Sequence, residues 1–255
     1  MHFRPTVPVD DPAELMRVSA FRRQLDAGAS STGADEMATR NSALGPSLLQ
    51  DLQRFERDGH KGELLEVLAA CVRHGRSLLV HLQIEDRMLP MSVFPADRLV
   101  HLPIEMERFL SMPLGDLRVA AYEPPTLRPP AESKPRGLGA LLADAPTFEP
   151  LGPLLWELAL RGSRDELLPE IAGVVAYRVA PGMELRALKL TGSLATAAQR
   201  LQRETCSLRE IAAWPSFDRQ RAMRMLNGLY LQAGLIVSRT HPAAINDHWR
   251  SSTAA

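Results

Sequence analysis

A proline-rich stretch in the middle of the chain is the feature that most constrains its fold. Five of the fifteen residues from Glu123 to Gly137 are proline. Proline has no backbone N–H donor and favours extended conformations, so neither a helix nor a central strand can run through this stretch. The sequence therefore predicts a semi-rigid linker or surface strap over residues 124–140, with separate structure on each side.

The segment before this linker mixes helical and strand-like patterns. Helices are predicted from Pro46, which suits a first helical position, to Gly59, and over residues 63–74, ending at Gly75. Period-two alternation predicts strands over residues 78–84, 91–94, 99–102 and 117–122, around a short helix at residues 104–110. Because the spacings between these strands are short, hairpins are favoured, and residues 44–123 are predicted to form a module of helices and an antiparallel sheet.

The first 43 residues lack such a regular pattern. Pro5, Pro8 and Pro12 interrupt them early, and residues 28–33 form a spacer of small residues. We therefore expect residues 1–43 to be a poorly ordered lead, with room for one short amphipathic helix over residues 14–25.

The half of the chain after the linker is predicted to be mainly helical, so the whole is of the α+β class. Residues 141–190 form a predicted helical connector, with a helix at residues 154–168 that Gly162 splits and a short strand at residues 174–179. Residues 191–245 hold three further predicted helices, the first capped by Ser193 and the second capped by Ser207, with Glu210 completing a capping box. The third helix follows Asp218 and closes at Gly234; a strand at residues 235–239 and a tail at residues 246–255 come after it.

This last region is similar to a known family of domains. The pattern consists of SLREIA at residues 207–212, a brief turn, the helix at residues 221–231 and AGLIV at residues 233–237. It resembles the winged helix-turn-helix of many bacterial regulators, and the likeness covers about a quarter of the chain. The resemblance implies a winged-helix-like domain over residues 191–245 whose third helix enters the major groove of DNA.

Charge is unevenly distributed along the chain. The chain as a whole has thirty basic and thirty acidic residues, so it is not a polyelectrolyte. From residue 171 onward there are eleven basic and five acidic residues, an excess of six positive charges, which leaves six negative charges on the preceding 170 residues. A charged partner must therefore be met by a local patch, and the basic half is the better candidate.

Helical geometry identifies the candidate interface. At about 100° per residue, Gln220, Arg224 and Asn227 point away from the apolar side of the third helix, with Arg221 at the flank. The resemblance implies that these four side chains contact DNA and that Arg239, at the wing, meets a phosphate or the minor groove. Leu231 lies on the same outward face and favours a buried protein surface instead. DNA and a protein partner therefore both remain open.

Enzymatic, metal and cofactor chemistry find little support in the sequence. We find no nucleophile elbow, phosphate-binding loop or complete dinucleotide fingerprint. The one close cysteine–histidine pair, Cys71 and His74, has no second such pair with which to complete a metal site. Trp156, Trp214 and Phe217 are predicted to be core residues. Two cysteines, no secretory signal and no apolar run of membrane length predict a cytoplasmic protein that does not insert into a membrane.

These observations favour two functions. The first is a non-enzymatic bacterial regulatory protein that binds DNA through a C-terminal winged helix and has an N-terminal module for sensing or dimerisation. If that module serves dimerisation, the protein forms a homodimer. The alternative is a signalling adaptor that uses both modules for protein–protein contacts. We predict no catalytic residue, no metal site and no cofactor in either case.

Overall fold

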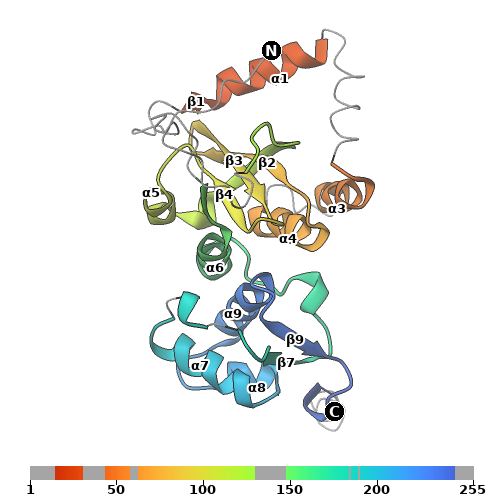
Figure 1. Cartoon of the computed structure of the whole chain (residues 1–255), viewed down its shortest axis with the longest axis vertical. Coiled ribbons are helices and arrows are strands. Elements are labelled where there is room, and N and C mark those ends of the chain that lie inside the picture. The colour runs from red at the N-terminus through yellow and green to blue at the C-terminus, as the bar shows by residue number, and fades with distance from the viewer. Residues whose placement is uncertain are drawn as a thin grey trace, which may run out of the picture. The chain divides into compact units, whose positions relative to one another are not determined.

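A computed structural model describes residues 15–30, 44–57, 63–129, 148–183, 185–188 and 190–244 (Figure 1). The chain divides into two compact units, residues 1–154 and 155–255. The division falls inside helix α6 (Leu151–Arg161) and not at the predicted linker, of which residues 130–140 lie outside the described residues.

The N-terminal unit is built on an antiparallel six-stranded sheet. The strands run in the order β5-β2-β3-β4-β6, with β1 pairing beside one end of β3. Their bounds are β1 (Met16–Arg17), β2 (Leu78–Ile84), β3 (Arg87–Phe94), β4 (Leu99–His101), β5 (Arg118–Glu123) and β6 (Phe148–Pro150). The predicted positions of four of these strands are confirmed, because β2 to β5 cover them to within a few residues.

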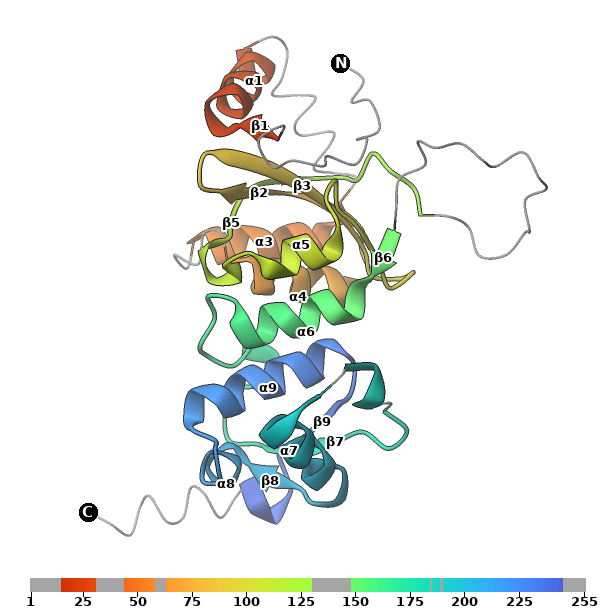
Figure 2. The same cartoon turned by 90° about the vertical axis from the view of Figure 1, so that its left-hand side faces the viewer.

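Four helices accompany this sheet. They are α1 (Val18–Ser30), α3 (Pro46–Arg57), α4 (Leu64–His74) and α5 (Met106–Ser111), and a 3-10 turn, η2, spans Leu114–Asp116. Figure 2 shows α3, α4 and α5 on the same side of the sheet. The predicted boundaries hold where local chemistry sets them: α3 begins at Pro46, and α4 ends at Gly75, whose φ of 60° is the left-handed conformation that glycine tolerates best.

Two predictions about the ends of this unit are wrong. Residues 15–30 are not a poorly ordered lead, because β1 pairs with β3 and the side chains of Leu15 and Phe21 are buried. Residues 148–190 are more than a helical connector: α6 ends just before Gly162 and β7 (Ala176–Val179) lies at the predicted strand, but β6, which was not predicted, pairs with β4 in the first sheet, and β7 belongs to a second sheet. Both errors concern strand pairs between distant parts of the sequence, which local patterns do not reveal.

The C-terminal unit combines a three-stranded antiparallel sheet with helices. The strand order is β8-β7-β9, with β8 at Cys206–Ser207 and β9 at Leu235–Ser238. The helices are the later part of α6, α7 (Gly192–Arg203), α8 (Leu208–Ala212) and α9 (Arg219–Leu231), with short 3-10 turns η3 (Pro169–Ile171) and η4 (Leu185–Leu188). The apolar core that joins them contains Ala198, Leu201, Ile211, Ala222, Met225, Leu226 and Leu229.

Two helix N-terminal caps were predicted in this unit, and the structure confirms one of them. The capping box of α8 is confirmed: the backbone N–H of Glu210 donates to Ser207 Oγ over 3.3 Å, and Glu210 Oε2 accepts from the backbone N–H of Ser207 at 2.8 Å. The cap at Ser193 is wrong, because α7 begins at Gly192 and its N-cap is Thr191, two residues earlier. Without a strong capping hydrogen bond, the first residue of a helix is the least determined by sequence.

The end of α9 also differs from the prediction. The helix stops at Leu231, and the residue that turns left-handed is Ala233, with φ 56°, instead of Gly234. A Cβ at Gly234 would overlap the end of the Met183 side chain, which would have to move aside. Gly234 therefore lies close to Met183 and is not the left-handed stop of the helix.

A winged arrangement is not confirmed. Strand β9 pairs with β7, which precedes α7 in the chain, and residues 239–244 that follow β9 contain no strand to complete a hairpin with it. What the structure does show is a short helix, a turn and a longer helix, α8 to α9, beside a small sheet. Within the described part of the chain, no helix combines the length and apolar character needed to cross a membrane.

Candidate nucleic-acid interface

Helix α9 has two regions with opposite environments. At its N-terminal turn the side chains of Arg219, Gln220 and Arg221 are exposed. Further along, Arg224 is half-buried, and Asn227 is 0% exposed. The prediction that the polar residues of this helix share one exposed face therefore describes Gln220 and Arg221, and it is wrong for Asn227.

The amide of Asn227 is used inside the fold. Its Nδ2 donates to the carbonyl oxygen of Glu166 at 2.8 Å, and its Oδ1 accepts from the backbone N–H of Leu168 at 2.9 Å. Both partners belong to the segment that follows α6. A buried amide with two such partners meets the usual requirement for buried polar groups. Asn227 therefore fastens α9 to this segment and is not available to a partner molecule.

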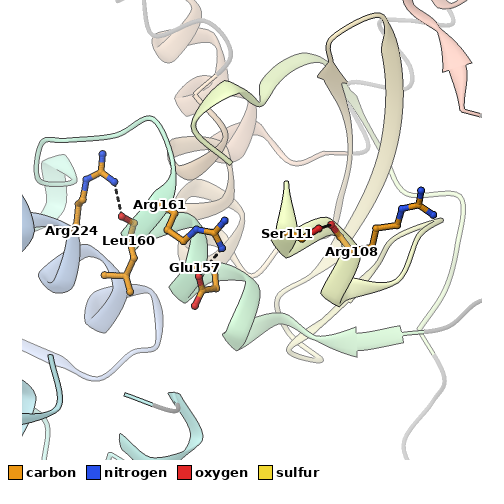
Figure 3. Close-up of polar contacts among 6 residues, drawn as sticks. All are labelled: Arg108, Ser111, Glu157, Leu160, Arg161 and Arg224. Carbon is orange, nitrogen blue, oxygen red and sulfur yellow. Dashed lines mark hydrogen bonds and ion pairs between the residues drawn. The ribbon is translucent and has the colours of Figure 1, made fainter. Parts of the chain in front are cut away.

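Arg224 is also directed at the protein's own backbone. Its Nη1 donates to the carbonyl oxygen of Leu160 at 2.5 Å (Figure 3). Leu160 lies in the last turn of α6, where carbonyls lack partners within the helix and where the helix dipole favours a positive charge. The same last turn carries an ion pair, Arg161 Nη1 to Glu157 Oε2, at 3.3 Å. Arg224 thus caps α6 instead of facing solvent.

Gly228 explains how α6 and α9 come so close. A Cβ built on this residue would lie 2.6 Å from two ring carbons of Trp156, a distance that real Cβ atoms do not show. The side chain of Trp156 is buried, and Leu231, one turn after Gly228, is only 1% exposed. The apolar Leu231 on the outward face, together with Gly228, is the sequence signal for this second packed face of α9. At Gly228 this face is covered by Trp156, which belongs to the same unit.

The N-terminal turn of α9 is held by a cluster of two arginines and two aromatic rings. Asp218 Oδ1 caps the helix by accepting from the backbone N–H of Arg221 at 2.7 Å. The guanidinium of Arg221 lies 5.4 Å from the centre of the Phe217 ring, and its Nη2 donates to Ser193 Oγ over 2.9 Å. The ring of Phe217 meets that of Trp214 edge to face at 6.2 Å.

The cluster continues onto α7. The guanidinium of Arg200 lies 4.7 Å from the centre of the Trp214 ring, on the side of α7 that faces the turn. We call Arg200, Trp214, Phe217 and Arg221 the arginine–aromatic cluster. Trp214 is buried as predicted for a core residue, whereas Phe217 is half-buried. Cation–π contacts at exposed sites contribute little each, so they support the packing of the turn on α7 weakly.

Tyr177 of β7 is affected by the positive charges of two arginines: Arg219 at the start of α9, and Arg239, which was predicted to contact DNA at the wing. The phenol is buried and donates to the carbonyl oxygen of Ile171 at 2.7 Å. Burial raises the pKa of Tyr177 to about 12, while the positive charges of Arg239 and Arg219 act on it in the opposite direction. Two exposed arginines from different elements therefore lie within electrostatic range of one side chain. Sequence reasoning missed Arg219, although it begins the helix next to Gln220.

We call Arg219, Gln220, Arg221 and Arg239 the basic turn. Arg239 follows β9 and is exposed, and its Nη1 lies 3.5 Å from the position that a Cβ on Gly173 would take. Of the five residues predicted for the interface, Gln220, Arg221 and Arg239 thus remain exposed, while Arg224 and Asn227 support the fold.

Other chemistry is sparse in the part of the chain that the structure describes. No three histidine, cysteine, aspartate or glutamate side chains there lie close enough together to hold a metal ion. Burial raises the pKa of the Cys71 thiol to about 12 and that of the Cys206 thiol to about 11, so neither thiol ionises near neutral pH.

Comparison with family models, with curated proteins and with solved structures finds no match to this chain. Its function must therefore be inferred from its own residues.

Proposed function

We propose that this chain is a non-enzymatic regulatory protein whose C-terminal unit binds duplex DNA through the basic turn. The observation that supports this most directly is the exposure of Arg219, Gln220 and Arg221 in the first turn of a helix that follows a short helix and a turn. In helix-turn-helix proteins this end of the second helix is the part that contacts base edges.

The chemistry of the basic turn suits a nucleic-acid backbone. Arginine neutralises phosphates, and glutamine can read adenine. Because Arg224 and Asn227 are held inside the fold, the contact with bases is limited to the end of the helix. Binding should therefore depend mostly on phosphates and discriminate weakly between sequences.

The test is the salt dependence of binding to a random-sequence duplex, followed by fluorescence anisotropy. Each phosphate contact contributes about 0.9 to the slope of log K against log salt concentration. We expect Arg219→Gln and Arg239→Gln each to lower the slope by about that amount. Arg22→Gln, an exposed arginine of α1 in the other unit, is the matched control and should leave it unchanged. Equal slopes for all four proteins would contradict DNA binding at the basic turn.

A second candidate function, a protein–protein adaptor, is favoured by an apolar edge in the same unit. Strand β9 pairs with β7 on one side, and among the described strands none pairs with its other side. Ile236 in β9 is 44% exposed, and Val174 just before β7 is 52% exposed. An unpaired edge with apolar side chains can accept a strand from another protein. A partner captured by the wild type and by Arg219→Gln but lost with Ile236→Lys would favour this function.

A further inference from the structure

A pocket of about 220 Å³ lies between α7 and the turn that leads into α9. One wall consists of Ser193, Thr196, Ala197 and Arg200 of α7, and the other contains Trp214 and Phe217. The four α7 residues follow helical spacing, so they line one face of that helix. The pocket exists because three of them are small and leave space in front of two aromatic rings.

The polar side chains of the pocket are the cation Arg200 and the hydroxyl groups of Ser193, Thr196 and Ser216, and the hydroxyl of Thr196 already donates to the carbonyl oxygen of Gly192. Arg200 uses its Nε for an ion pair with Glu204 Oε2 at 2.8 Å, and among the described residues no hydrogen bond engages its two terminal amino groups. Ser193 Oγ accepts from Arg221, which leaves its hydroxyl proton to donate. A guanidinium fork with a hydroxyl donor in the same pocket is suited to a carboxylate.

We propose that this pocket binds a small aromatic carboxylate. A cavity of about 150 Å³ is known to hold a benzene ring, so the larger space here accommodates a ring with one carboxylate group. The guanidinium of Arg200 already lies 4.7 Å from the centre of the Trp214 ring, so the ligand ring is placed beside that guanidinium, against Phe217 and Ala197. Its carboxylate pairs with the terminal amino groups of Arg200. A bare phosphate would satisfy the guanidinium but leave the aromatic walls without contacts, which is why the observations favour a ligand with a ring.

The pocket adjoins the basic turn, because Arg221 of the basic turn contacts two residues of the pocket wall. Arg221 donates to Ser193 and lies over Phe217, two residues of the pocket wall, while its helix carries Arg219 and Gln220. Ligand binding is expected in the free protein, and it does not depend on DNA binding.

The experiment is a titration of the DNA-free full chain with benzoate, followed by ¹⁹F NMR of 5-fluorotryptophan. The chain has three tryptophans, and the resonance absent from Trp214→Phe identifies the one in the pocket. We expect a saturable shift of that resonance. Arg200→Gln should weaken the affinity about tenfold, and Thr196→Leu should abolish binding by filling the pocket. Arg203→Gln, which changes another exposed arginine of α7 outside the pocket, should leave the affinity unchanged.

Four results would overturn the proposal: no saturable shift with benzoate, equal affinity for benzyl alcohol, equal affinity for inorganic phosphate, or equal weakening by Arg203→Gln and Arg200→Gln. The first result would exclude the binding site. Equal affinity for benzyl alcohol would exclude recognition of the carboxylate, and equal affinity for phosphate would exclude recognition of the ring. The last result would exclude a specific role for Arg200. If Arg200→Gln does not fold, retained binding by a folded Thr196→Leu also refutes the proposal. Because no DNA is present, these results leave the proposed DNA binding to its own test.

Discussion

The two ends of α9 carry similar side chains with opposite roles. Arg221 and Gln220 at its start are exposed, and the guanidinium of Arg221 lies over the ring of Phe217. Arg224 and Asn227, one and two turns later, reach back to the protein's own backbone carbonyls. The residue types and the helical spacing are almost the same, so neither distinguishes the two roles.

The difference lies in what stands opposite each end. The later part of α9 faces the last turn of α6 and the segment behind it, both of which have backbone groups without partners in regular structure. Arginine and asparagine satisfy these groups and are buried in doing so. At the start of the helix Arg221 contacts Phe217 of the turn and Ser193 of α7, and its side chain stays exposed. A polar stripe on a helix therefore indicates a binding surface only when no neighbouring element needs polar partners.

The largest expected effect concerns the packed end of α9. We expect Gly228→Val to destabilise the C-terminal unit by about 3 kcal/mol, because the new side chain must displace the ring of Trp156. All three tryptophans lie in residues 155–255, so urea unfolding followed by tryptophan fluorescence reports on this unit. Gln220→Val at the exposed end is the control and should change stability by less than about 0.5 kcal/mol. Similar losses of stability for Gly228→Val and Gln220→Val would contradict the conclusion that one end of α9 is packed and the other exposed.

A smaller loss is expected for Asn227→Ala. Removing the amide leaves the N–H of Leu168 and the carbonyl of Glu166 without their partner, at a cost of about 2 kcal/mol in the free energy of unfolding. Gln220→Ala removes an amide of similar chemistry from the exposed turn and should be nearly neutral. If urea unfolding shows Asn227→Ala to be neutral too, the amide does not hold the segment after α6.

Features set by neighbouring residues were predictable from the sequence. The start of α3 at Pro46, the end of α4 at Gly75 and the capping box of Ser207 with Glu210 each depend on a few adjacent residues. The strand at residues 78–84 is confirmed in position, although its first five residues are all buried, so burial does not alternate along it as the pattern predicts. Such signals need no knowledge of the rest of the fold.

Features set by distant pairs were not predictable. The pairing of β1 with β3 joins Met16 to Met88, and that of β6 with β4 joins Phe148 to His101, with no local pattern to announce either. The burial of Asn227 likewise depends on residues about sixty positions earlier in the chain. Leu231 and Gly228 indicate that α9 has a second packed face, but the sequence does not show which element covers that face. Arg219 and the arginine–aromatic cluster needed the folded turn to become visible.

Arg224→Met sharpens the comparison further along the same face. The substitution keeps an unbranched apolar stem but removes the guanidinium that donates to the carbonyl of Leu160, and we expect a loss of about 1 kcal/mol in the free energy of unfolding. The cost is moderate because Nε of Arg224 is buried without a hydrogen-bond partner among the described residues, and its removal offsets part of the loss. Urea unfolding measures this effect. A gain in stability would mean that the capping bond to α6 contributes nothing.

Arg221→Met is the counterpart at the exposed end, and its effect on stability should be the smallest, less than about 0.5 kcal/mol. The loss is small because both the bond to Ser193 and the contact with Phe217 are made at the surface, where water replaces the lost partner. Its effect on binding should be the reverse of that of Arg224→Met: the slope of log K against log salt falls by about 0.9 for Arg221→Met and stays unchanged for Arg224→Met. The two variants are therefore expected to have opposite effects: Arg224→Met lowers stability without changing the salt slope, and Arg221→Met changes the slope with little loss of stability. Urea unfolding and salt titration with duplex DNA measure the two quantities. If both variants lose stability and neither changes the slope, α9 is structural along its whole length and the adaptor becomes the better explanation.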